Sequence, residues 1–340
     1  MSVYLFSAAL ISAAVSWLVS ELSRRGGVLD FPEARSLHAT PTPRSGGLGI
    51  LAGCGAGALV LLAAPVGAPG MAAALAFAGA CGALGFLDDL FALNGRIKFA
   101  CMCALCLALA GLYPVDRLSV TLEWSIALFP VLAVAGSALF LFTVINAVNF
   151  VDGSDGMLAA VLIPAGIGLA VAGLASGSLS TSFLGVLLAG SLLGMLGLNL
   201  PPARLFAGDA GSLAAGALYG AGALLMAGKG FAGSLWLAPL FVLPVLVDVL
   251  LTLLRRARHG RLSLEAHSEH AFQRLIKTGW SHAQAAMAYG GLSSLCVLAG
   301  LVAAQGPDAA PFLAFVLGCA GLTGAYAWAG AYARRRGVDA

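Results

Sequence analysis

Five aspartates in three short polar stretches are the residues of this sequence best suited to chemistry on a phosphate. LDDL contains Asp88 and Asp89, NAVNFVDGSDGM contains Asp152 and Asp155, and FAGDAGS contains Asp209. Mg²⁺ prefers such hard oxygen ligands and completes its coordination with water and phosphate oxygens. Neighbouring carboxylates also raise each other's pKa, which suits proton transfer. The pattern predicts a shared site for a divalent cation and a phosphorylated ligand.

Each polar stretch could instead be a solvated helix end, because Asp and Asn favour caps and turns. Asp155 and Gly156 directly precede an apolar segment and fit such a cap. All three stretches, however, adjoin segments long enough to cross a membrane, where a central carboxylate costs about 2.5–3.5 kcal/mol. Three such stretches together favour a functional site, and a capping role for Asp155 is compatible with it.

A basic segment, residues 254–282, contains six Lys and Arg residues and four of the five histidines. His267 and His270 are three residues apart and would share one face of a helix. Zinc binding is an alternative, but a third ligand and an HExxH motif are lacking. The arginines alone would also suit contact with anionic lipids. The two histidines and Gln273 better suit recognition of a phosphate or another polar group.

The elements that carry these residues are predicted to be membrane helices. Of the 340 residues, 60% are hydrophobic and only 10% are charged, whereas a soluble domain carries about 25% charged residues. So few charges cannot form a water-exposed surface, so we expect an all-α polytopic membrane protein with one domain, residues 1–340. The seven cysteines are interpreted as small apolar residues. The eleven predicted segments are approximately 4–22, 46–65, 70–87, 97–113, 124–145, 157–176, 182–199, 211–227, 231–253, 283–304 and 310–332.

The distribution of basic residues predicts the orientation of these segments. The first segment has no basic residue before it and is followed by Arg24 and Arg25. With the N-terminus outside, sixteen of the 18 Lys and Arg residues lie on the cytoplasmic side, leaving only Arg117 and Lys229 outside. This orientation places the C-terminus, the three acidic stretches and the basic segment on the cytoplasmic side.

Glycines at the second segment suggest both binding and packing roles. Gly46 and Gly47 follow Arg44 at its start, where exposed backbone N–H groups would suit an anion. The GxxxG pairs Gly53/Gly57 and Gly190/Gly194 are interpreted as helix packing rather than a dimer signal. The oligomeric state stays open, with a homodimer as one option.

Several motifs together resemble the polyprenyl-phosphate N-acetylhexosamine-1-phosphate transferases of the glycosyltransferase 4 type. LDDL resembles the aspartate pair of this family, and FAGDAGS resembles its GDxGS motif. NAVNFVDGSDGM resembles NxxNxxDGxDGL, with Met157 in place of leucine. AHSEHAFQRL is similar to the HxxHxxQRL form of bacterial members that initiate O-antigen or related surface glycans, and HATPTPRSGG resembles the first cytoplasmic loop. These motifs occur in family order across residues 35–282.

The resemblance implies a reaction at a bacterial inner membrane. Undecaprenyl phosphate, or another polyprenyl phosphate, attacks the β-phosphate of a UDP-N-acetylhexosamine, UMP leaves, and a polyprenyl-diphospho-sugar remains in the bilayer. This would initiate a lipid-linked surface glycan such as lipopolysaccharide. Mg²⁺ is the implied cofactor, with Mn²⁺ as an alternative. The implied partners are these substrates and membrane lipids, without nucleic acid.

The resemblance also assigns roles to residues. Asp209 and Asn149 would bind the metal, and Asp88 and Asp89 would deprotonate or orient the polyprenyl phosphate, or one would act as nucleophile. The residues that would contact the substrates are Asp152, Asp155, His267, His270, Gln273 and Arg44. The His267-x-x-His270 spacing differs from that of the branch that uses UDP-MurNAc-pentapeptide, and therefore favours a sugar without peptide.

Two other classes of protein could use this sequence. A transporter would use carboxylates along a path near the middle of the bilayer, and a membrane scaffold would have no use for three acidic motifs. Asp248, in FVLPVLVDVLL, is the one aspartate inside a predicted segment. It is interpreted as an inward-facing residue that is structural or supports the site from behind the substrate-contacting residues, with a proton relay as the alternative.

Overall fold

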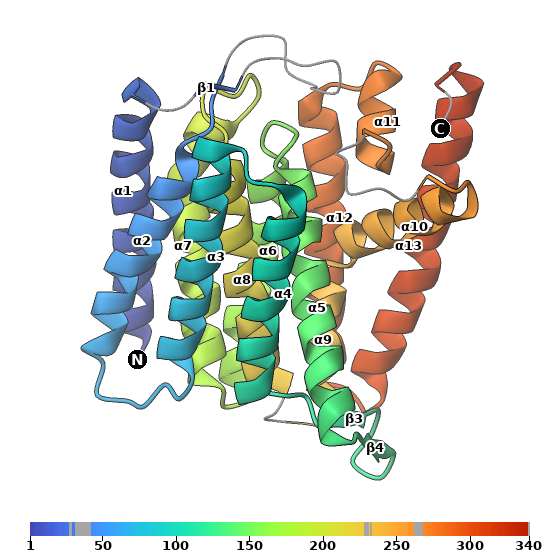
Figure 1. The fold of residues 1–340 in the computed structure, drawn as a ribbon. Helices are drawn as coiled ribbons and strands as arrows, with labels where there is room; N and C mark the ends of the chain where they lie inside the picture. Colours follow the sequence, from blue (N-terminus) through green and yellow to red (C-terminus); the bar gives the residue numbers. More distant parts are fainter. Residues whose placement is uncertain (27–28, 31–41, 228–230, 232, 262–267, 339–340) are drawn as a thin grey trace.

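The computed structural model describes residues 1–26, 29–30, 42–227, 231, 233–261 and 268–338. Long helices run side by side through most of the molecule (Figure 1), which confirms the predicted all-α fold. Within the described ranges, nine helices are long and apolar enough to cross a membrane, and a bent pair makes a tenth. The helix Gly46–Leu62 is apolar but has 17 residues. Each of the eleven predicted segments therefore corresponds to a helix or to the bent pair.

The chain order of the elements follows the predicted segments, with short additions between them. The structure has two small antiparallel sheets of two strands each: β1 pairs with β2, and β3 pairs with β4. The bounds are α1 Ser2–Gly26, β1 Leu29–Asp30, β2 Thr42–Pro43, α2 Gly46–Leu62, α3 Met71–Phe91, α4 Gly95–Leu112, β3 Arg117–Ser119, β4 Ser125–Ala127, α5 Pro130–Val151, α6 Met157–Ala175, α7 Leu179–Asn199, α8 Gly208–Ala227, η1 Ser234–Trp236, α9 Leu237–Phe241, α10 Leu243–Arg258, α11 Ala271–Lys277, α12 His282–Ala303 and α13 Ala310–Arg335.

The fifth helix begins later than the sequence predicts. Residues Ser125–Ala127 form strand β4, and α5 starts at Pro130, which occupies the first helical turn. Proline suits this position because its missing N–H has no partner there and its φ angle is already helical. The helix then continues to Val151, so that Asn149 lies inside its last turn rather than in a connecting loop.

The ninth predicted segment is bent rather than straight. Its two parts, Ser234–Phe241 and Leu243–Arg258, meet at an angle of 73°. Val242 between them has non-helical backbone angles, and Pro244 follows in the first turn of α10. Proline lacks the N–H that would bond to the preceding turn, and its ring clashes with that turn. The bend turns α10 toward α11 and α13 (Figure 1).

Helix α8 forms the centre of the bundle. All of its residues except Asp209 and Ala227 are buried. Its glycines, like those of neighbouring helices, allow close contact: a Cβ on Gly47 would lie 2.7 Å from the Cα of Gly211. Gly53 of α2 similarly leaves room for Ser16 of α1, since a Cβ there would lie 2.8 Å from the serine Cβ. Such small-residue contacts bring membrane helices together, and the interpretation of the GxxxG pair as packing is confirmed for Gly53.

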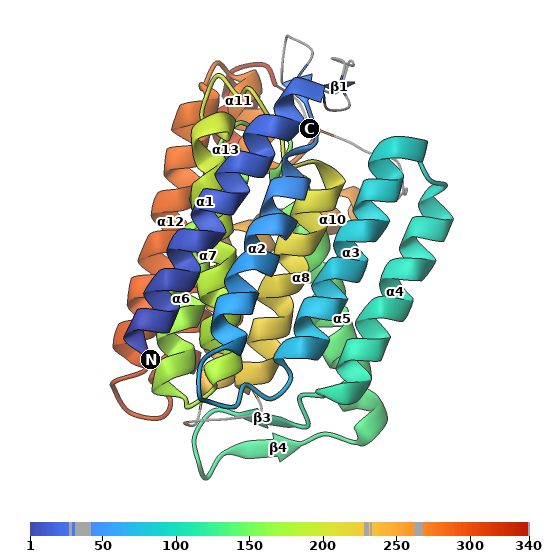
Figure 2. The same ribbon diagram turned by 90° about the vertical axis from the view of Figure 1, so that its left-hand side faces the viewer.

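One end of the bundle collects the segments that the sequence predicts to be cytoplasmic. It carries α11, the C-terminal end of α13 and the α3–α4 connection, and we refer to it as the α11 end (Figure 1). The start of α1 and the β3–β4 hairpin lie at the opposite end (Figure 2). The described parts of the predicted cytoplasmic connections thus share one side of the molecule.

Candidate active site

Two of the predicted aspartates pair with one lysine where the start of α8 meets the end of α3 and the start of α4. Lys98 Nζ lies 2.7 Å from Asp88 Oδ2 and also forms an ion pair with Asp209 Oδ2. Asp88 Oδ1 accepts a further hydrogen bond, 2.8 Å long, from the backbone N–H of Leu93. The three charged side chains are 18–26% exposed. Carboxylates from two distant parts of the chain therefore share one ammonium group that solvent can still reach.

Local sequence features place these three side chains. A Cβ on Gly85 would overlap the carbonyl of Asp209 and lie 2.7 Å from Ala210 N, so only glycine lets α3 approach α8 this closely. Asn94 caps α4, because its Oδ1 accepts a 2.9 Å hydrogen bond from Arg96 N. The cap starts the helix at Gly95 and places Lys98 in its first turn.

Asp89 also connects the end of α3 to the start of α8. Its Oδ2 accepts a 3.1 Å hydrogen bond from the backbone N–H of Ala210, in the first turn of α8. A carboxylate is stabilised at this position because the N-terminus of a helix carries partial positive charge. Arg44 Nε lies 3.8 Å from Asp89 Oδ1, and its Nη2 lies 3.4 Å from the Asp89 carbonyl. The structure thus places Arg44 beside the acidic residues.

Asn149 reaches the junction from the last turn of α5. Its Oδ1 lies 3.0 Å from the hydroxyl of Ser212, which also lies 2.9 Å from the Gly208 carbonyl. Ser212 is one turn after Asp209 on α8, so this contact places the Asn149 amide beside the first turns of α8. The predicted convergence of the three polar stretches at one end of the bundle is present in the structure.

Asp152 follows α5 and has an unusual environment. Its Oδ1 is buried and has no hydrogen-bond partner among the residues that the structure describes. Burial raises the pKa of this carboxyl well above its usual range; the backbone N–H groups of Gly208 and Ala207 oppose the rise, and the charges of Asp209 and Asp89 add to it. Burial of such a carboxylate oxygen without a partner lowers the stability of the fold, unless the carboxyl is protonated or binds a cation.

Asp155 is engaged in a different set of contacts. Its Oδ2 accepts a 2.9 Å hydrogen bond from Ala203 N, and His282 Nδ1 lies 3.6 Å from Oδ1. The N-cap of α6 is Gly156 in a left-handed conformation, φ +73°, rather than Asp155. The Gly156 N–H donates to Asn199 Oδ1 over 3.1 Å. The contacts of Asp155 therefore tie the α5–α6 connection to the α7–α8 connection and to the start of α12.

The basic segment contributes through α11. His270 is 2% exposed and is the N-cap of this helix, where Gln273 Oε1 accepts a 3.1 Å hydrogen bond from the His270 N–H. The His270 ring centroid lies 4.9 Å from that of Phe150, the residue after Asn149. His270 thus contacts the last turn of α5, which also carries Asn149. His267 lies outside the described residues.

The glycines at the start of α2 do not present their N–H groups to an anion. The Gly46 N–H donates to the Phe206 carbonyl over 2.9 Å, and the Gly47 N–H donates to the Ala207 carbonyl over 2.8 Å. The prediction of an anion site there was wrong, because the connection before α8 already satisfies both donors. These two bonds instead hold the start of α2 next to the start of α8.

Sequence reasoning missed Lys98. Its position indicated only one more positive charge on the cytoplasmic side, although it lies ten residues after Asp88. A lone lysine at the edge of an apolar segment is a weak signal, because most such residues face lipid headgroups. Its proximity to the aspartate pair was the available hint.

Electrostatically, the site is a cluster of four carboxylates with two cations. We name this set, consisting of Asp88, Asp89, Asp152, Asp209, Lys98 and Arg44, the acidic cluster. Its residues come from helix ends and the segments next to them, not from the middle of the helices, where a transporter would need them. Such a set can bind a cation and align anionic phosphates beside a membrane surface.

Comparison with known proteins agrees with this arrangement. The sequence profile of Glycosyl transferase family 4 matches residues 71–227, which contain three motifs of the acidic cluster. Decaprenyl-phosphate N-acetylglucosaminephosphotransferase of Mycolicibacterium smegmatis is 31% identical over 323 residues, covering 83% of this chain and 76% of the relative. This chain belongs to the family. It is accordingly a multi-pass membrane phosphoglycosyltransferase.

Other members of the family show how its substrates vary. Similarity extends to the probable undecaprenyl-phosphate N-acetylglucosaminyl 1-phosphate transferase of Bacillus subtilis, which is 29% identical over 274 residues, covering 78% of this chain and 74% of the relative. Phospho-N-acetylmuramoyl-pentapeptide-transferase of a Synechococcus species is 32% identical over 330 residues, covering 86% of this chain and 87% of the relative. Overall similarity therefore joins both branches, and the substrate must be argued from the site.

Proposed function

We propose that this enzyme transfers N-acetylhexosamine 1-phosphate from a UDP-sugar to undecaprenyl phosphate, releases UMP, and so initiates a lipid-linked surface glycan. The observation that carries the proposal is the meeting of Asp88, Lys98 and Asp209 at the α11 end of three long helices. A lipid phosphate anchored in the bilayer and a water-soluble nucleotide sugar can meet only at such a boundary. The predicted topology assigns this boundary to the cytoplasmic face of a bacterial inner membrane.

The acidic cluster has the donor chemistry that Mg²⁺ requires. Carboxylate and amide oxygens of Asp209, Asn149 and Asp152 lie around the start of α8, and the buried Asp152 Oδ1 has no hydrogen-bond partner among the described residues. Across the same residues, no three His, Cys, Asp or Glu side chains already surround one metal position. A site completed by substrate phosphate needs fewer protein ligands than that.

Asp209 and Asn149 would hold the cation, and Asp152 would add a further oxygen. When bound, Mg²⁺ would neutralise phosphate charge and help to align the diphosphate with its attacker. We propose Mg²⁺ as the cofactor, with Mn²⁺ as an alternative.

The described ion pairs suggest how the chain itself handles the phosphates. Lys98 Nζ is held between Asp88 and Asp209, so the ammonium group is already oriented before any substrate arrives. A diphosphate oxygen would offer it a stronger anionic partner, and Lys98 would then stabilise charge on the phosphate under attack. As Lys98 turns to the diphosphate, Asp88 would be released to orient the polyprenyl phosphate or accept its proton.

Arg44 and Asp89 would act at the lipid side. Arg44 lies beside Asp89 and is half-buried, so its guanidinium can hold a lipid phosphate oxygen while Asp89 keeps it in place. His270 and Gln273 would serve the nucleotide side, through the contact of α11 with Phe150. The donor is proposed to be a UDP-N-acetylhexosamine without peptide, because of the His267-x-x-His270 spacing.

Purified protein tests this proposal directly. It would be supplied with undecaprenyl phosphate, Mg²⁺ and a panel of UDP-sugars: UDP-N-acetylglucosamine, UDP-N-acetylgalactosamine and UDP-MurNAc-pentapeptide. We expect UMP release and a labelled lipid product with one of the two UDP-N-acetylhexosamines, and loss of both on addition of EDTA. Folded protein that transfers none of the donors, or that transfers only the pentapeptide substrate, would contradict the proposal.

A further inference from the structure

We infer that Asp248, buried within α10, is a positioning residue that holds α11 in place and thereby sets the affinity for the nucleotide sugar. This inference rests on the function proposed above and concerns the same site. Asp248 is 4% exposed and is the aspartate that the sequence places inside an apolar segment. Its contacts favour the structural role over the proton relay considered for it.

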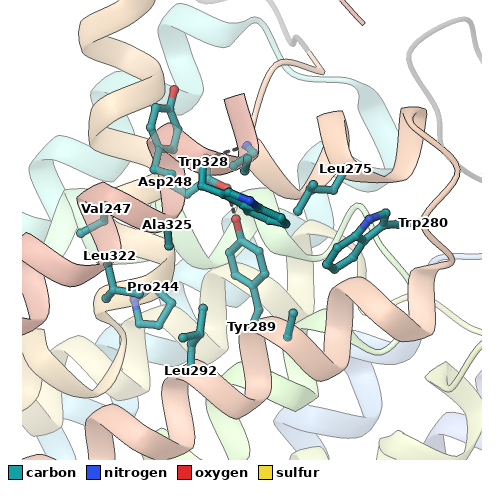
Figure 3. A pocket seen from close by; sticks show the side chains of 14 residues that line it. Pro244, Val247, Asp248, Leu275, Trp280, Tyr289, Leu292, Leu322, Ala325 and Trp328 are labelled. Carbon is teal, nitrogen blue, oxygen red and sulfur yellow. Dashed lines mark hydrogen bonds between the residues drawn. The ribbon is translucent and has the colours of Figure 1, made fainter. Parts of the chain in front are cut away.

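Both oxygens of the Asp248 carboxylate are engaged. Oδ1 accepts hydrogen bonds from the Ala271 N–H over 2.8 Å and from the Thr252 hydroxyl over 3.1 Å. Oδ2 accepts a 2.6 Å hydrogen bond from the Tyr289 hydroxyl, as Figure 3 shows. The donors belong to α11, α10 and α12. One carboxylate therefore connects three helices just after the bend between α9 and α10.

The surroundings make this connection hard to replace. Asp248 and Tyr289 border a cavity of about 100 Å³ that is mostly apolar, with Pro244, Leu292 and Leu322 in its wall (Figure 3). A buried amide or hydroxyl that loses its hydrogen-bond partner there destabilises the folded state, because water cannot replace the partner. Removal of the carboxylate would therefore leave the Ala271 N–H and the Tyr289 hydroxyl without a good substitute.

Helix α11 depends on such anchors because it has only seven residues. A helix this short is not stable by itself. Glu269, which precedes it, pairs with Arg255 and Arg256 of α10. Arg274 of α11 donates a 3.1 Å hydrogen bond to the Gly330 carbonyl of α13. Among these anchors, Asp248 is the one that holds the first residue of α11.

The position of Ala271 also affects the residues that are proposed to serve the nucleotide. Ala271 follows His270, whose ring lies against Phe150 next to Asn149. His270 Nδ1 itself lies 3.6 Å from Asp248 Oδ1. A looser α11 would therefore move His270 and Gln273 relative to the acidic cluster, while Asp88, Lys98 and Arg44 on other helices would stay in place. Binding of the UDP-sugar should suffer, and binding of the lipid phosphate should not.

Kinetics of three variants test the inference, with the best donor from the panel above. Tyr289→Phe removes one hydroxyl and keeps the carboxylate, and Asp248→Asn replaces one acceptor oxygen with an amide donor. We expect the KM for the UDP-sugar to rise about fivefold in the first and about tenfold or more in the second. The KM for undecaprenyl phosphate and kcat should stay within about twofold. Tyr326→Phe is the matched control. Tyr326 lines the same cavity, but its hydroxyl lies 3.2 Å from the Thr252 hydroxyl instead of bonding to Asp248.

Hydrogen exchange gives a second readout that needs no activity. Amides of residues 271–277 should exchange faster in Asp248→Asn and Tyr289→Phe than in the wild type or in Tyr326→Phe. An unchanged KM for the UDP-sugar, or an equal rise of KM for both substrates, would overturn the inference. Should Asp248→Asn not fold, the Tyr289→Phe result decides. Wild-type protein without transferase activity would contradict the proposed function, and hydrogen exchange would still test the anchoring of α11.

Discussion

The acidic cluster and the single aspartate Asp248 differ in how their negative charge is balanced. In the acidic cluster, four carboxylates face two cations, and one buried oxygen has no hydrogen-bond partner among the described residues. At Asp248, one carboxylate accepts three hydrogen bonds and is almost fully buried. An aspartate with all its oxygens engaged is suited to holding helices together. A cluster with excess negative charge and partial exposure is suited to binding cations and phosphates.

The largest effect is expected from Asp209→Asn in the acidic cluster. The change keeps the shape of the side chain but removes the charge that Lys98 and a bound cation would share, so turnover should fall roughly a thousandfold. UMP release by purified protein measures this, with Asp116→Asn, an exposed aspartate at the opposite end, as the control. Activity within tenfold of the wild type would remove Asp209 from the proposed metal site.

Replacing Lys98 should have the next largest effect. Lys98→Met leaves Asp88 and Asp209 without their shared cation and removes the group proposed to stabilise phosphate charge, so kcat/KM should fall about a hundredfold. Lys98→Arg should recover part of this loss, because it restores the charge with a different shape. The exposed neighbour Arg96 offers the control Arg96→Gln, which should change kcat/KM by less than about twofold. Equal effects at both positions would point to a general loss of basic charge.

A packing change should separate geometry from charge. In Gly85→Ala the new methyl group would overlap the backbone of Asp209, so α3 and α8 must move apart. We expect about 1–3 kcal/mol lower stability and about tenfold lower kcat/KM. Gly79→Ala on the same helix is the matched control, because its Cβ would meet no atom within 4 Å. Thermal unfolding and UMP release would measure both variants; a Gly85→Ala protein with normal activity would show that the α3–α8 spacing is not critical.

The smallest effect in the acidic cluster is expected at its lipid side. Arg44→Gln removes a charge that lies beside Asp89, and the KM for undecaprenyl phosphate should rise about fivefold while the KM for the UDP-sugar stays the same. This is the opposite of the selectivity expected at Asp248. A rise in the KM for the UDP-sugar alone would move Arg44 to the nucleotide side of the site.

Much of this architecture could be predicted from sequence because bilayers impose simple rules. Long apolar segments predicted the all-α fold, and polar motifs at their ends indicated that Asp88, Asn149 and Asp209 lie at one end of the bundle. The bend at Val242 was missed because hydropathy does not register a local break in the helix, although Pro239 and Pro244 flank it.

Pairings between distant residues were beyond the sequence. Lys98 could not be matched to Asp209, and Gly46 could not be matched to the Phe206 carbonyl, because both contacts depend on how helices pack. The roles of Asp152 and Asp155 differ for the same reason, since two aspartates three residues apart meet different neighbours. Asp248 was expected to be structural, and its three hydrogen bonds agree with that interpretation.

The most direct test of the central claim follows one phosphorus atom. Purified protein would receive undecaprenyl phosphate, Mg²⁺ and a UDP-N-acetylhexosamine labelled with ³²P at the β-phosphate. If the acidic cluster directs the lipid phosphate to that phosphorus, the label will enter the lipid phase and UMP will appear in equal amount. Label that stays with released UDP would mean attack at the sugar carbon instead, and would contradict the account.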